Sequence, residues 1–176
     1  MSFELSILDW FQTLHTPGWD KFMTSVTKLG NAGILWIVLT LVLLFIPKMR
    51  KTGMIMAAAL LTDFLLCNIL LKNIVARIRP YDVNTTIQLL VEKLRDYSFP
   101  SGHTAASFAS VTALYLAGEK RLGIAALVIA VLIAVSRLYL YVHYPTDVLG
   151  GILFGCISGW IGYHIIKFVE KKRSIK

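Results

Sequence analysis

Long apolar runs separated by short polar segments dominate this chain of 176 residues. Five such runs stand out, and they cover residues 33–46, 54–71, 105–118, 122–135 and 148–166. A helix needs about 20 apolar residues to cross the hydrocarbon core of a bilayer, and several of these runs are shorter. We therefore expect the helices to continue into the polar residues that flank each run. The pattern predicts an all-α integral membrane protein with a bundle of about five to six transmembrane helices.

The first 30 residues have an amphipathic rather than a continuously apolar pattern. Their apolar side chains recur at helical spacing, beginning with Phe3, Ile7, Trp10, Phe11 and Leu14. A helix with one apolar face and one polar face is typical of a segment that lies in the membrane interface. Pro17 and Gly18 interrupt this helix, and a second amphipathic stretch at 19–29 leads into the first apolar run. We predict an N-terminal interfacial helix, and the pattern leaves open whether residues 3–14 lie on the membrane or cross it.

The composition agrees with a membrane protein. Hydrophobic residues make up 56% of the chain and charged residues 16%, against about 45–50% and about 25% in soluble domains. The first residues lack a basic segment and a small-residue cleavage site, so we do not expect a cleaved signal peptide. Because no linker or repeat divides the chain, we expect one membrane-embedded domain over residues 1–176. It would have interfacial helices in 1–30 and a transmembrane bundle in 31–170.

The net charge of +8 is distributed unevenly between the two ends of the predicted helices. One set of ends carries ten basic residues, namely Lys48, Arg50, Lys51, Lys120, Arg121, Lys167, Lys171, Lys172, Arg173 and Lys176. The other set carries eight, namely Lys21, Lys28, Lys72, Arg77, Arg79, Lys93, Arg95 and Arg137. Three of these eight are candidate ligand-binding residues, and without them the basic residues are divided ten to five. Because cytoplasmic loops are enriched in Lys and Arg, we expect the first set and the C-terminus in the cytoplasm. The orientation of the helices in the membrane thus explains the excess of basic residues better than a nucleic-acid partner does.

Small residues form stripes on two of the predicted helices. One stripe consists of Ala106, Ala109, Ala113 and Ala117, and the other consists of Gly151, Gly155 and Gly159. Small residues let helix backbones approach closely in lipid. We expect these two helices to pack against each other.

Three polar clusters lie at the helix ends that we place outside the cytoplasm. The first follows the second apolar run and contains Lys72, Arg77 and Arg79; the others are the segments 100–103 and 136–147. Fixed cations beside the free N–H groups at the start of a helix favour a multiply charged anion, and phosphate is the obvious candidate. Within the second cluster, Gly102 permits close backbone approach, and Ser101 can cap the helix or donate its hydroxyl to a phosphate oxygen.

Two histidines in these clusters can divide the work of phosphoryl transfer. One attacks phosphorus, and the other donates a proton to the departing oxygen. Asp147 lies four residues after His143, around the helix-starting Pro145, so it can hold one imidazole nitrogen while the other faces phosphorus. This favours His143 as the nucleophile and His103 as the general acid.

The three clusters match a known three-part signature. K-x6-R-P (Lys72 to Pro80), P-S-G-H (Pro100 to His103) and S-R-x5-H-x3-D (Ser136 to Asp147) resemble the motifs of the type 2 phosphatidic acid phosphatase family. That family shares its fold with vanadium haloperoxidases and glucose-6-phosphatases. The resemblance implies a metal-independent phosphatase without cofactors, which forms a phosphohistidine in a single phosphatase domain.

The resemblance also implies the role of each matched residue. His143 would be the nucleophile, Asp147 its orienting partner and His103 the general acid. The phosphate oxygens would be held by Lys72, Arg79, Ser101, Gly102 and Arg137. Arg77 lies inside the x6 segment, so no role transfers to it.

Simpler interpretations exist for each residue alone. Lys72 and Arg79 can be interfacial anchors, and Ser101 can be only a helix cap. His143 and Asp147 can form a structural hydrogen bond or half of a metal site, although the surrounding cations disfavour a metal ion. Asp63 lies nine residues before Lys72, half a turn out of phase on an α-helix, so we expect it outside the pocket. It would join helices or serve an ion or proton path.

We predict an enzyme of the cell membrane that removes phosphate from a lipid phosphate or diphosphate at the outer leaflet. Its partners would be the bilayer and the lipid, and the sequence does not determine the oligomeric state. Undecaprenyl diphosphate is favoured by analogy with small bacterial family members; phosphatidylglycerol phosphate and phosphatidic acid are the other candidates. The alternatives are a lipid phosphotransferase that uses the same site and a non-enzymatic lipid or anion transporter.

Overall fold

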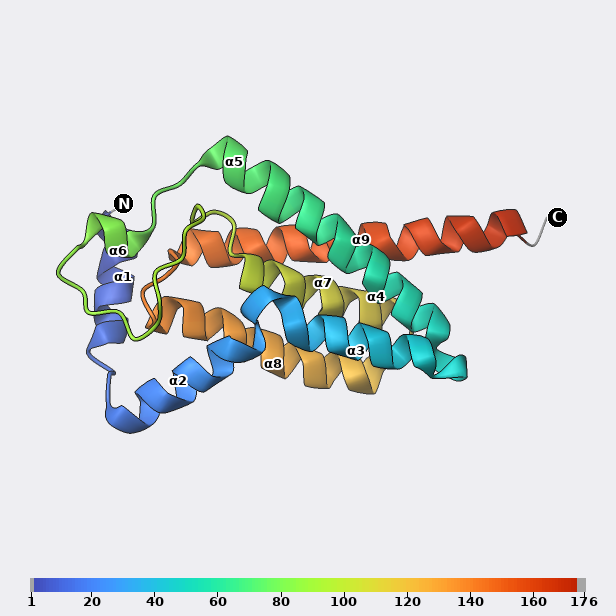
Figure 1. Cartoon of the computed structure of the whole chain (residues 1–176), viewed down its shortest axis with the longest axis horizontal. Helices are drawn as coiled ribbons and strands as arrows, with labels where there is room; N and C mark the ends of the chain where they lie inside the picture. The colour runs from blue at the N-terminus through green and yellow to red at the C-terminus, as the bar shows by residue number, and fades with distance from the viewer. Residues whose placement is uncertain (1, 174–176) are drawn as a thin grey trace.

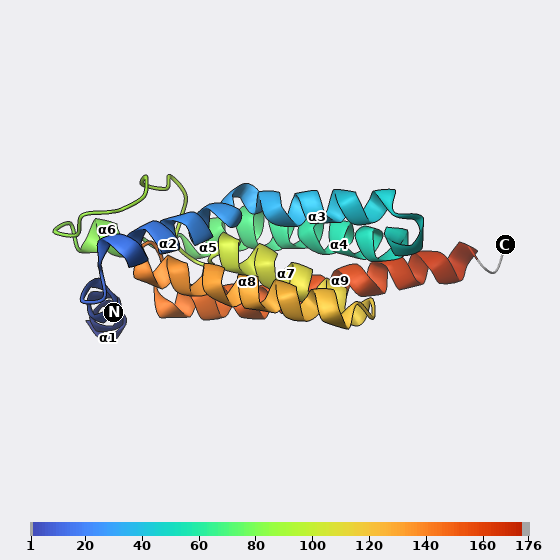
Figure 2. The ribbon, with the colours of Figure 1, turned by 90° about the horizontal axis from the view of Figure 1, so that it is seen from below.

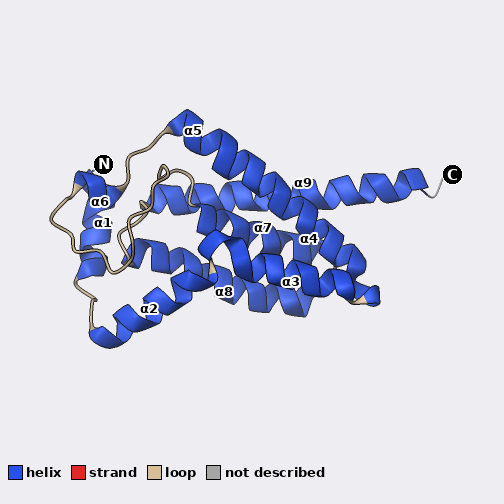
Figure 3. Cartoon of the chain, viewed as in Figure 1, coloured by secondary structure: helices blue, strands red, loops and turns tan. Residues whose placement is uncertain are grey.

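The computed structural model describes residues 2–173, and these residues fold into helices and loops without a strand (Figure 3). The α-helices are α1 (Ser2–Gln12), α2 (Pro17–Leu29), α3 (Ile34–Phe45), α4 (Arg50–Asp63), α5 (Lys72–Val75), α6 (Pro80–Val83), α7 (Gly102–Leu116), α8 (Lys120–Tyr139) and α9 (Pro145–Arg173). A π-helical segment, η3 (Phe64–Leu71), joins α4 to α5. Short 3-10 turns precede α3 (Asn31–Gly33) and α4 (Pro47–Met49).

The long helices run alongside one another, and the loops gather at one end of the bundle. In Figures 1 and 2, α3, α4, α7, α8 and α9 share one general direction, whereas α1 lies across the end that carries α6 and the 84–101 loop. Helix α7 forms the centre of the bundle, and Ala105, Ala109 and Leu114 on it are fully buried. This arrangement brings the starts of α7 and α9 and the last turn of α8 together at a single end.

Helices α7 and α9 pack through glycines, as the small-residue stripes predict. A Cβ atom on Gly155 would lie 2.4 Å from the carbonyl oxygen of Ala105, and one on Gly159 would lie 2.7 Å from that of Ala109. Real Cβ atoms do not approach other atoms so closely, so both positions require glycine for this backbone spacing. The expected contact between these two helices is confirmed. It places the segments 100–103 and 145–147 next to each other.

Three helices among residues 2–173 are long and apolar enough to cross a membrane: Pro47–Val83, Lys120–Tyr139 and Pro145–Lys172. Helices α2 and α3 meet at a bend of 43° and count as a fourth span if they are taken together. Helix α7 has 15 residues and is shorter than a full span, although it lies at the bundle centre. The predicted all-helical membrane architecture is confirmed.

The amphipathic N-terminal segment packs against protein as well as presenting an apolar surface. Leu8 of α1 is fully buried in a cluster with Met23 and the aromatic segment 139–144, whereas Phe3 and Trp10 are exposed. Pro17 does not end the first helix. It is the first residue of α2, and the side chain of Thr16 accepts a hydrogen bond from the Trp19 N–H across 3.4 Å.

Candidate active site

The three polar clusters of the sequence meet at the loop-bearing end of the bundle (Figure 1). Lys72 begins α5 and Arg79 precedes α6, while Gly102 begins α7. Arg137 lies in the last turn of α8, and the short turn that follows carries His143 into α9. Most of these polar side chains are buried, with 7% exposure for Lys72, 3% for Arg79, 2% for Arg137 and 1% for His143.

Asp147 is the most tightly held carboxylate of this region. Its Oδ2 atom accepts hydrogen bonds from Ser98 Oγ (2.5 Å) and the Tyr144 N–H (2.9 Å), and its Oδ1 atom accepts one from Arg77 Nη1 (2.6 Å). The Nδ1 atom of His143 lies 3.6 Å from Oδ2, which is longer than a hydrogen bond. Asp147 therefore faces the imidazole while other groups fix its own orientation.

The environment of His143 keeps its imidazole neutral. Burial, opposed in part by Asp147, lowers the pKa of His143 to about 3, and the positive charges of Arg79 and Arg137 act in the same direction as burial. Arg79 Nη1 lies 3.3 Å from Nε2 of His143, and a guanidinium can only donate. Nε2 thus carries the lone pair and Nδ1 carries the proton, which points toward Asp147. A neutral imidazole with its lone pair on Nε2 is the form that attacks phosphorus.

Asp96 joins the two cations that the first motif supplies. Its Oδ2 accepts a short hydrogen bond from Lys72 Nζ, and its Oδ1 accepts one of 2.7 Å from Arg79 Nη2. Partial burial opposes its ionisation, yet Lys72 and Arg79 hold the pKa of Asp96 at about 2. The two carboxylate oxygens thus occupy one donor of each cation. The sequence motifs give no sign of this role, because Asp96 lies in the loop between the first and second motifs.

The start of α7 approaches the same cations. A Cβ atom on Gly102 would lie 2.8 Å from Oδ1 of Asn68 and 3.6 Å from Lys72 Nζ, so the backbone here comes close to both side chains. Ser101 is at the N-cap position, but its side chain makes no cap hydrogen bond. Its hydroxyl instead accepts a hydrogen bond from Thr104 Oγ1 (3.0 Å), and its backbone N–H donates to the Asp147 carbonyl (3.0 Å).

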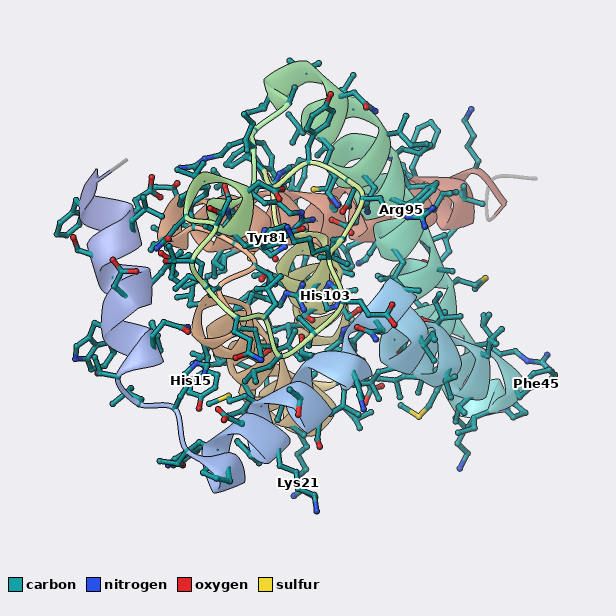
Figure 4. All side chains as sticks on the ribbon, turned by 60° about the vertical axis from the view of Figure 1, so that its left-hand side comes forward. His15, Lys21, Phe45, Tyr81, Arg95 and His103 are labelled. Carbon is teal, nitrogen blue, oxygen red and sulfur yellow. The ribbon has the colours of Figure 1, made fainter. Side chains whose placement is uncertain are left out.

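His103 lies between two cavities. One, of about 530 Å³, is lined by His103, Lys72, Gly102 and Asp96 together with apolar residues of α3 and α4. The other, of about 560 Å³, is lined by His103 and Arg137 together with the end of α2. His103 shares the first cavity with Lys72 and the second with Arg137. Figure 4 shows it beneath the loop that crosses this end of the molecule. Arg137 thus lines a different cavity from Lys72.

Asp63 lines the first cavity, and this corrects the expectation that it faces elsewhere. That expectation assumed an α-helix between Asp63 and Lys72, whereas the segment Phe64–Leu71 is π-helical. A π-helix closes i→i+5 hydrogen bonds and has a wider turn, which changes the phase between its two ends. Asp63 is 2% exposed, and its Oδ1 atom has no hydrogen-bond partner among the described residues.

Arg77 has a defined position although no motif assigns it a role. Its guanidinium donates to Asp147 Oδ1 and to Thr146 Oγ1 (2.6 Å each) and to Glu4 Oε2 on α1 (2.6 Å), and it stacks on the Tyr144 ring at 3.9 Å. Glu4 also accepts from the hydroxyl of Thr146 (2.6 Å). The N-terminal helix is therefore hydrogen-bonded to the turn that carries His143 and Asp147.

Within residues 2–173, no three His, Cys, Asp or Glu side chains are grouped in a way that could hold a metal ion.

Comparison with known proteins agrees with this arrangement. The model of the PAP2 superfamily matches residues 52–171. The chain is 33% identical over 157 residues to an undecaprenyl-diphosphatase from Sulfolobus acidocaldarius, covering 89% of this chain and 73% of that protein. It is 36% identical over 171 residues to phosphatidylglycerophosphatase B of Bacillus subtilis, covering 90% and 79%.

Solved structures show the same fold. The transmembrane PAP2 type phosphatidylglycerolphosphate phosphatase from Bacillus subtilis matches with a TM-score of 0.73 and 31% identity, over 97% of this chain and 86% of that chain. LpxE from Aquifex aeolicus matches with a TM-score of 0.78 and 30% identity, over 90% and 93%. The family match spans all three motifs and most of the bundle, and so the chain belongs to the PAP2 superfamily.

Proposed function

We propose that this protein is a membrane lipid phosphatase that hydrolyses a lipid phosphate or diphosphate through a phosphohistidine on His143. The observation that carries the proposal is the buried imidazole of His143, whose Nε2 lies 3.3 Å from Nη1 of Arg79 at the cation cluster. The relatives of this protein support phosphate hydrolysis as the reaction, because they are named as phosphatases of lipid substrates.

The first step is an in-line displacement at phosphorus. The substrate phosphate replaces the Asp96 carboxylate on Lys72 and Arg79, and the N–H groups at the start of α7 and the hydroxyl of Ser101 bind further oxygens. Nε2 of His143 attacks, the bond between phosphorus and the leaving oxygen breaks, and His103 donates a proton to that oxygen. Asp147 stabilises the positive charge that develops on the imidazole.

The second step releases phosphate and restores both histidines. His103, now neutral, takes a proton from a water molecule, and the resulting hydroxide attacks phosphorus. The bond between phosphorus and Nε2 breaks, which returns His143 to the neutral form with its proton on Nδ1. No metal ion or other cofactor takes part in these steps.

Among lipid substrates we favour a prenyl diphosphate such as undecaprenyl diphosphate. Two relatives are named as undecaprenyl-diphosphatases and a third as a putative one, whereas another is named as a phosphatidylglycerophosphatase. The loop between α6 and α7 has only 18 residues, 84–101, with which to shape a headgroup pocket. Phosphatidylglycerol phosphate and phosphatidic acid are the competing substrates for the assay.

We also propose that this end of the bundle faces the outer leaflet. The larger set of basic residues lies at the starts of α4 and α8, in the turn before α4 and at the end of α9, at the end of the bundle opposite the site (Figure 1). Lys176 of that set lies outside the described residues. The positive-inside rule then places the C-terminus in the cytoplasm, with residues 1–30 as interfacial helices and 31–170 as the catalytic bundle.

The test is release of inorganic phosphate by the purified protein from each of the three lipids. We expect the highest kcat/KM with the prenyl diphosphate and at least a thousandfold loss in His143→Asn, in line with the loss of a nucleophile. Labelled phosphate found on a second lipid rather than in water would instead identify a phosphotransferase. Lipid or anion transport that survives His143→Asn, without phosphate release by either protein, would identify a transporter.

A further inference from the structure

Asn68 is a polar residue of a membrane-spanning helix, and no motif assigns it a role. It lies in η3, four residues before Lys72, within the stretch Pro47–Val83 that is long and apolar enough to cross a membrane. Its side chain is half-buried and has no hydrogen-bond partner among residues 2–173. A polar group in a membrane span is costly unless it has a partner, and such residues commonly serve function. The position of Asn68 therefore favours a contact with a ligand.

Two cavities meet at Asn68. The first cavity, which His103 lines, also has an apolar part formed by Ile37, Leu60, Leu61 and Phe64. A second one of about 450 Å³, the loop-side cavity, has only polar residues in its described lining, including Asn73, Arg95 and Tyr97. The described residues that line both cavities are Asn68, Lys72 and Asp96. Because Lys72 and Asp96 are paired with each other, Asn68 is the member of this group whose polar atoms are unused.

The amide of Asn68 also approaches the start of α7. A Cβ atom on Gly102 would lie 2.8 Å from Oδ1 of Asn68 and 3.6 Å from Nζ of Lys72, so both side chains adjoin the same backbone. The N–H groups that begin a helix favour an anion at this point. Since no hydrogen bond fixes the amide, it can turn and present its nitrogen, which carries two donors, to such an anion.

The proposed reaction places the substrate phosphate within reach of this amide. Lys72 and Arg79 bind the phosphate, and the apolar lining of the first cavity is suited to the lipid chain. The same cavity contains Lys72, Gly102 and His103, so the phosphate and the chain are joined within it. Neither Arg79 nor Arg137 is among its described lining residues. Asn68 therefore faces a side of the phosphate that the two arginines leave open.

We propose that Asn68 is a further phosphate-binding residue, whose Nδ2 donates a hydrogen bond to an oxygen of the substrate phosphate. This inference rests on the proposed phosphatase function and deepens it, because it adds a neutral donor to the cations of the site. Asp96 occupies one donor of Lys72 and one of Arg79, whereas the amide of Asn68 is unoccupied. The substrate gains this hydrogen bond without displacing a group of the protein.

The experiment measures the dissociation constant of inorganic phosphate for the full-length protein by titration calorimetry, together with kcat/KM for farnesyl diphosphate. In Asn68→Ala we expect phosphate affinity and kcat/KM each to fall about tenfold, the loss of one hydrogen bond to a charged group. Asn68→Asp should lower phosphate affinity by at least about a hundredfold, because the new carboxylate also repels the anion.

Asn73 provides the matched control. It follows Lys72 directly, is exposed, lines the loop-side cavity but not the first, and donates its Nδ2 hydrogen bond to the Ile69 carbonyl across 2.6 Å. Asn73→Asp therefore adds the same charge near Lys72 without the proposed contact. We expect its phosphate affinity to stay within about threefold of the original, since an exposed charge is screened. Asn73→Ala should match the unaltered protein.

The outcomes separate this inference from the function on which it rests. If Asn68→Ala binds phosphate as tightly as the unaltered protein, or Asn73→Asp loses as much affinity as Asn68→Asp, the contact is wrong and the phosphatase function stands. A loss in Asn68→Ala that appears only together with a lower thermal midpoint shows a structural role and also overturns the inference. If the unaltered protein binds phosphate but releases none from any lipid, the phosphatase function fails, whereas the phosphate affinities report the contact without turnover.

Discussion

Arg77 Nη1 lies 2.6 Å from Oδ1 of Asp147, the carboxylate whose other oxygen faces the imidazole of His143. The same guanidinium is held by Glu4 of α1, so a residue near the N-terminus is two hydrogen bonds away from Asp147. This relationship makes Arg77 and Glu4 positioning residues for the catalytic pair. It explains why a cation that belongs to no motif is partly buried at this end of the bundle.

Arg77→Met should lower kcat by about 10- to 100-fold, the effect typical of groups that orient a functional side chain through one intermediate. The pH dependence gives a sharper test. Without the guanidinium, the charge of Asp147 acts more strongly on His143 and raises its pKa from about 3. Because the neutral imidazole attacks, the acid limb of the kcat/KM profile moves to higher pH. Arg121→Met, at the opposite end of the bundle, should leave the profile unchanged, and an identical profile in Arg77→Met would contradict a positioning role.

Glu4→Gln should produce a smaller change in the same direction. It weakens the hold on Arg77 and on Thr146 but leaves the Arg77–Asp147 pair in place. We expect a loss in kcat of about three- to tenfold with an unaltered KM, since Glu4 does not contact the substrate pocket. A change confined to KM would show instead that α1 acts on lipid binding.

Asp96→Asn should strengthen binding of phosphate to the resting enzyme. The Asp96 carboxylate occupies Lys72 and Arg79, and a substrate phosphate must displace it. We expect the inhibition constant of inorganic phosphate to fall about tenfold, which corresponds to about 1.4 kcal/mol. Since the pKa of Asp96 is about 2, its charge is constant above pH 4, and the gain should not vary between pH 5 and 8. Asp82→Asn, which removes an exposed pairing with Lys93, is the control.

Gly155→Ala should destabilise the fold without touching the site. The new methyl group would lie 2.4 Å from the Ala105 carbonyl oxygen, so α7 and α9 must separate. Overpacking of this kind costs about 1–3 kcal/mol, and the melting temperature in detergent should fall by several degrees. Gly18→Ala, where no atom lies within 4 Å of the added carbon, should have little effect. Equal melting temperatures for the two variants would refute the close contact.

The motifs and the apolar pattern predict most of the fold and the residues of the candidate site. Apolar runs locate the helices because a segment must be apolar to lie in the hydrocarbon core of a bilayer. The stripes of Ala and Gly locate the contact between α7 and α9. The prediction that Asp63 lies outside the pocket was wrong, because nothing in the local sequence indicates that η3 is π-helical. Asp96 and Glu4 were not assigned a role because their partners are distant along the chain. A contact between distant segments produces no pattern of residue spacing in the sequence of either segment.

The central claim is that His143 carries the phosphoryl group during turnover. Rapid acid-free quenching of the purified protein with a lipid diphosphate labelled in the terminal phosphate, followed by peptide mapping, tests it directly. We predict acid-labile, alkali-stable label on the peptide that contains His143, and none in His143→Asn. Phosphate release without any labelled peptide, or label that persists in His143→Asn, would contradict the account.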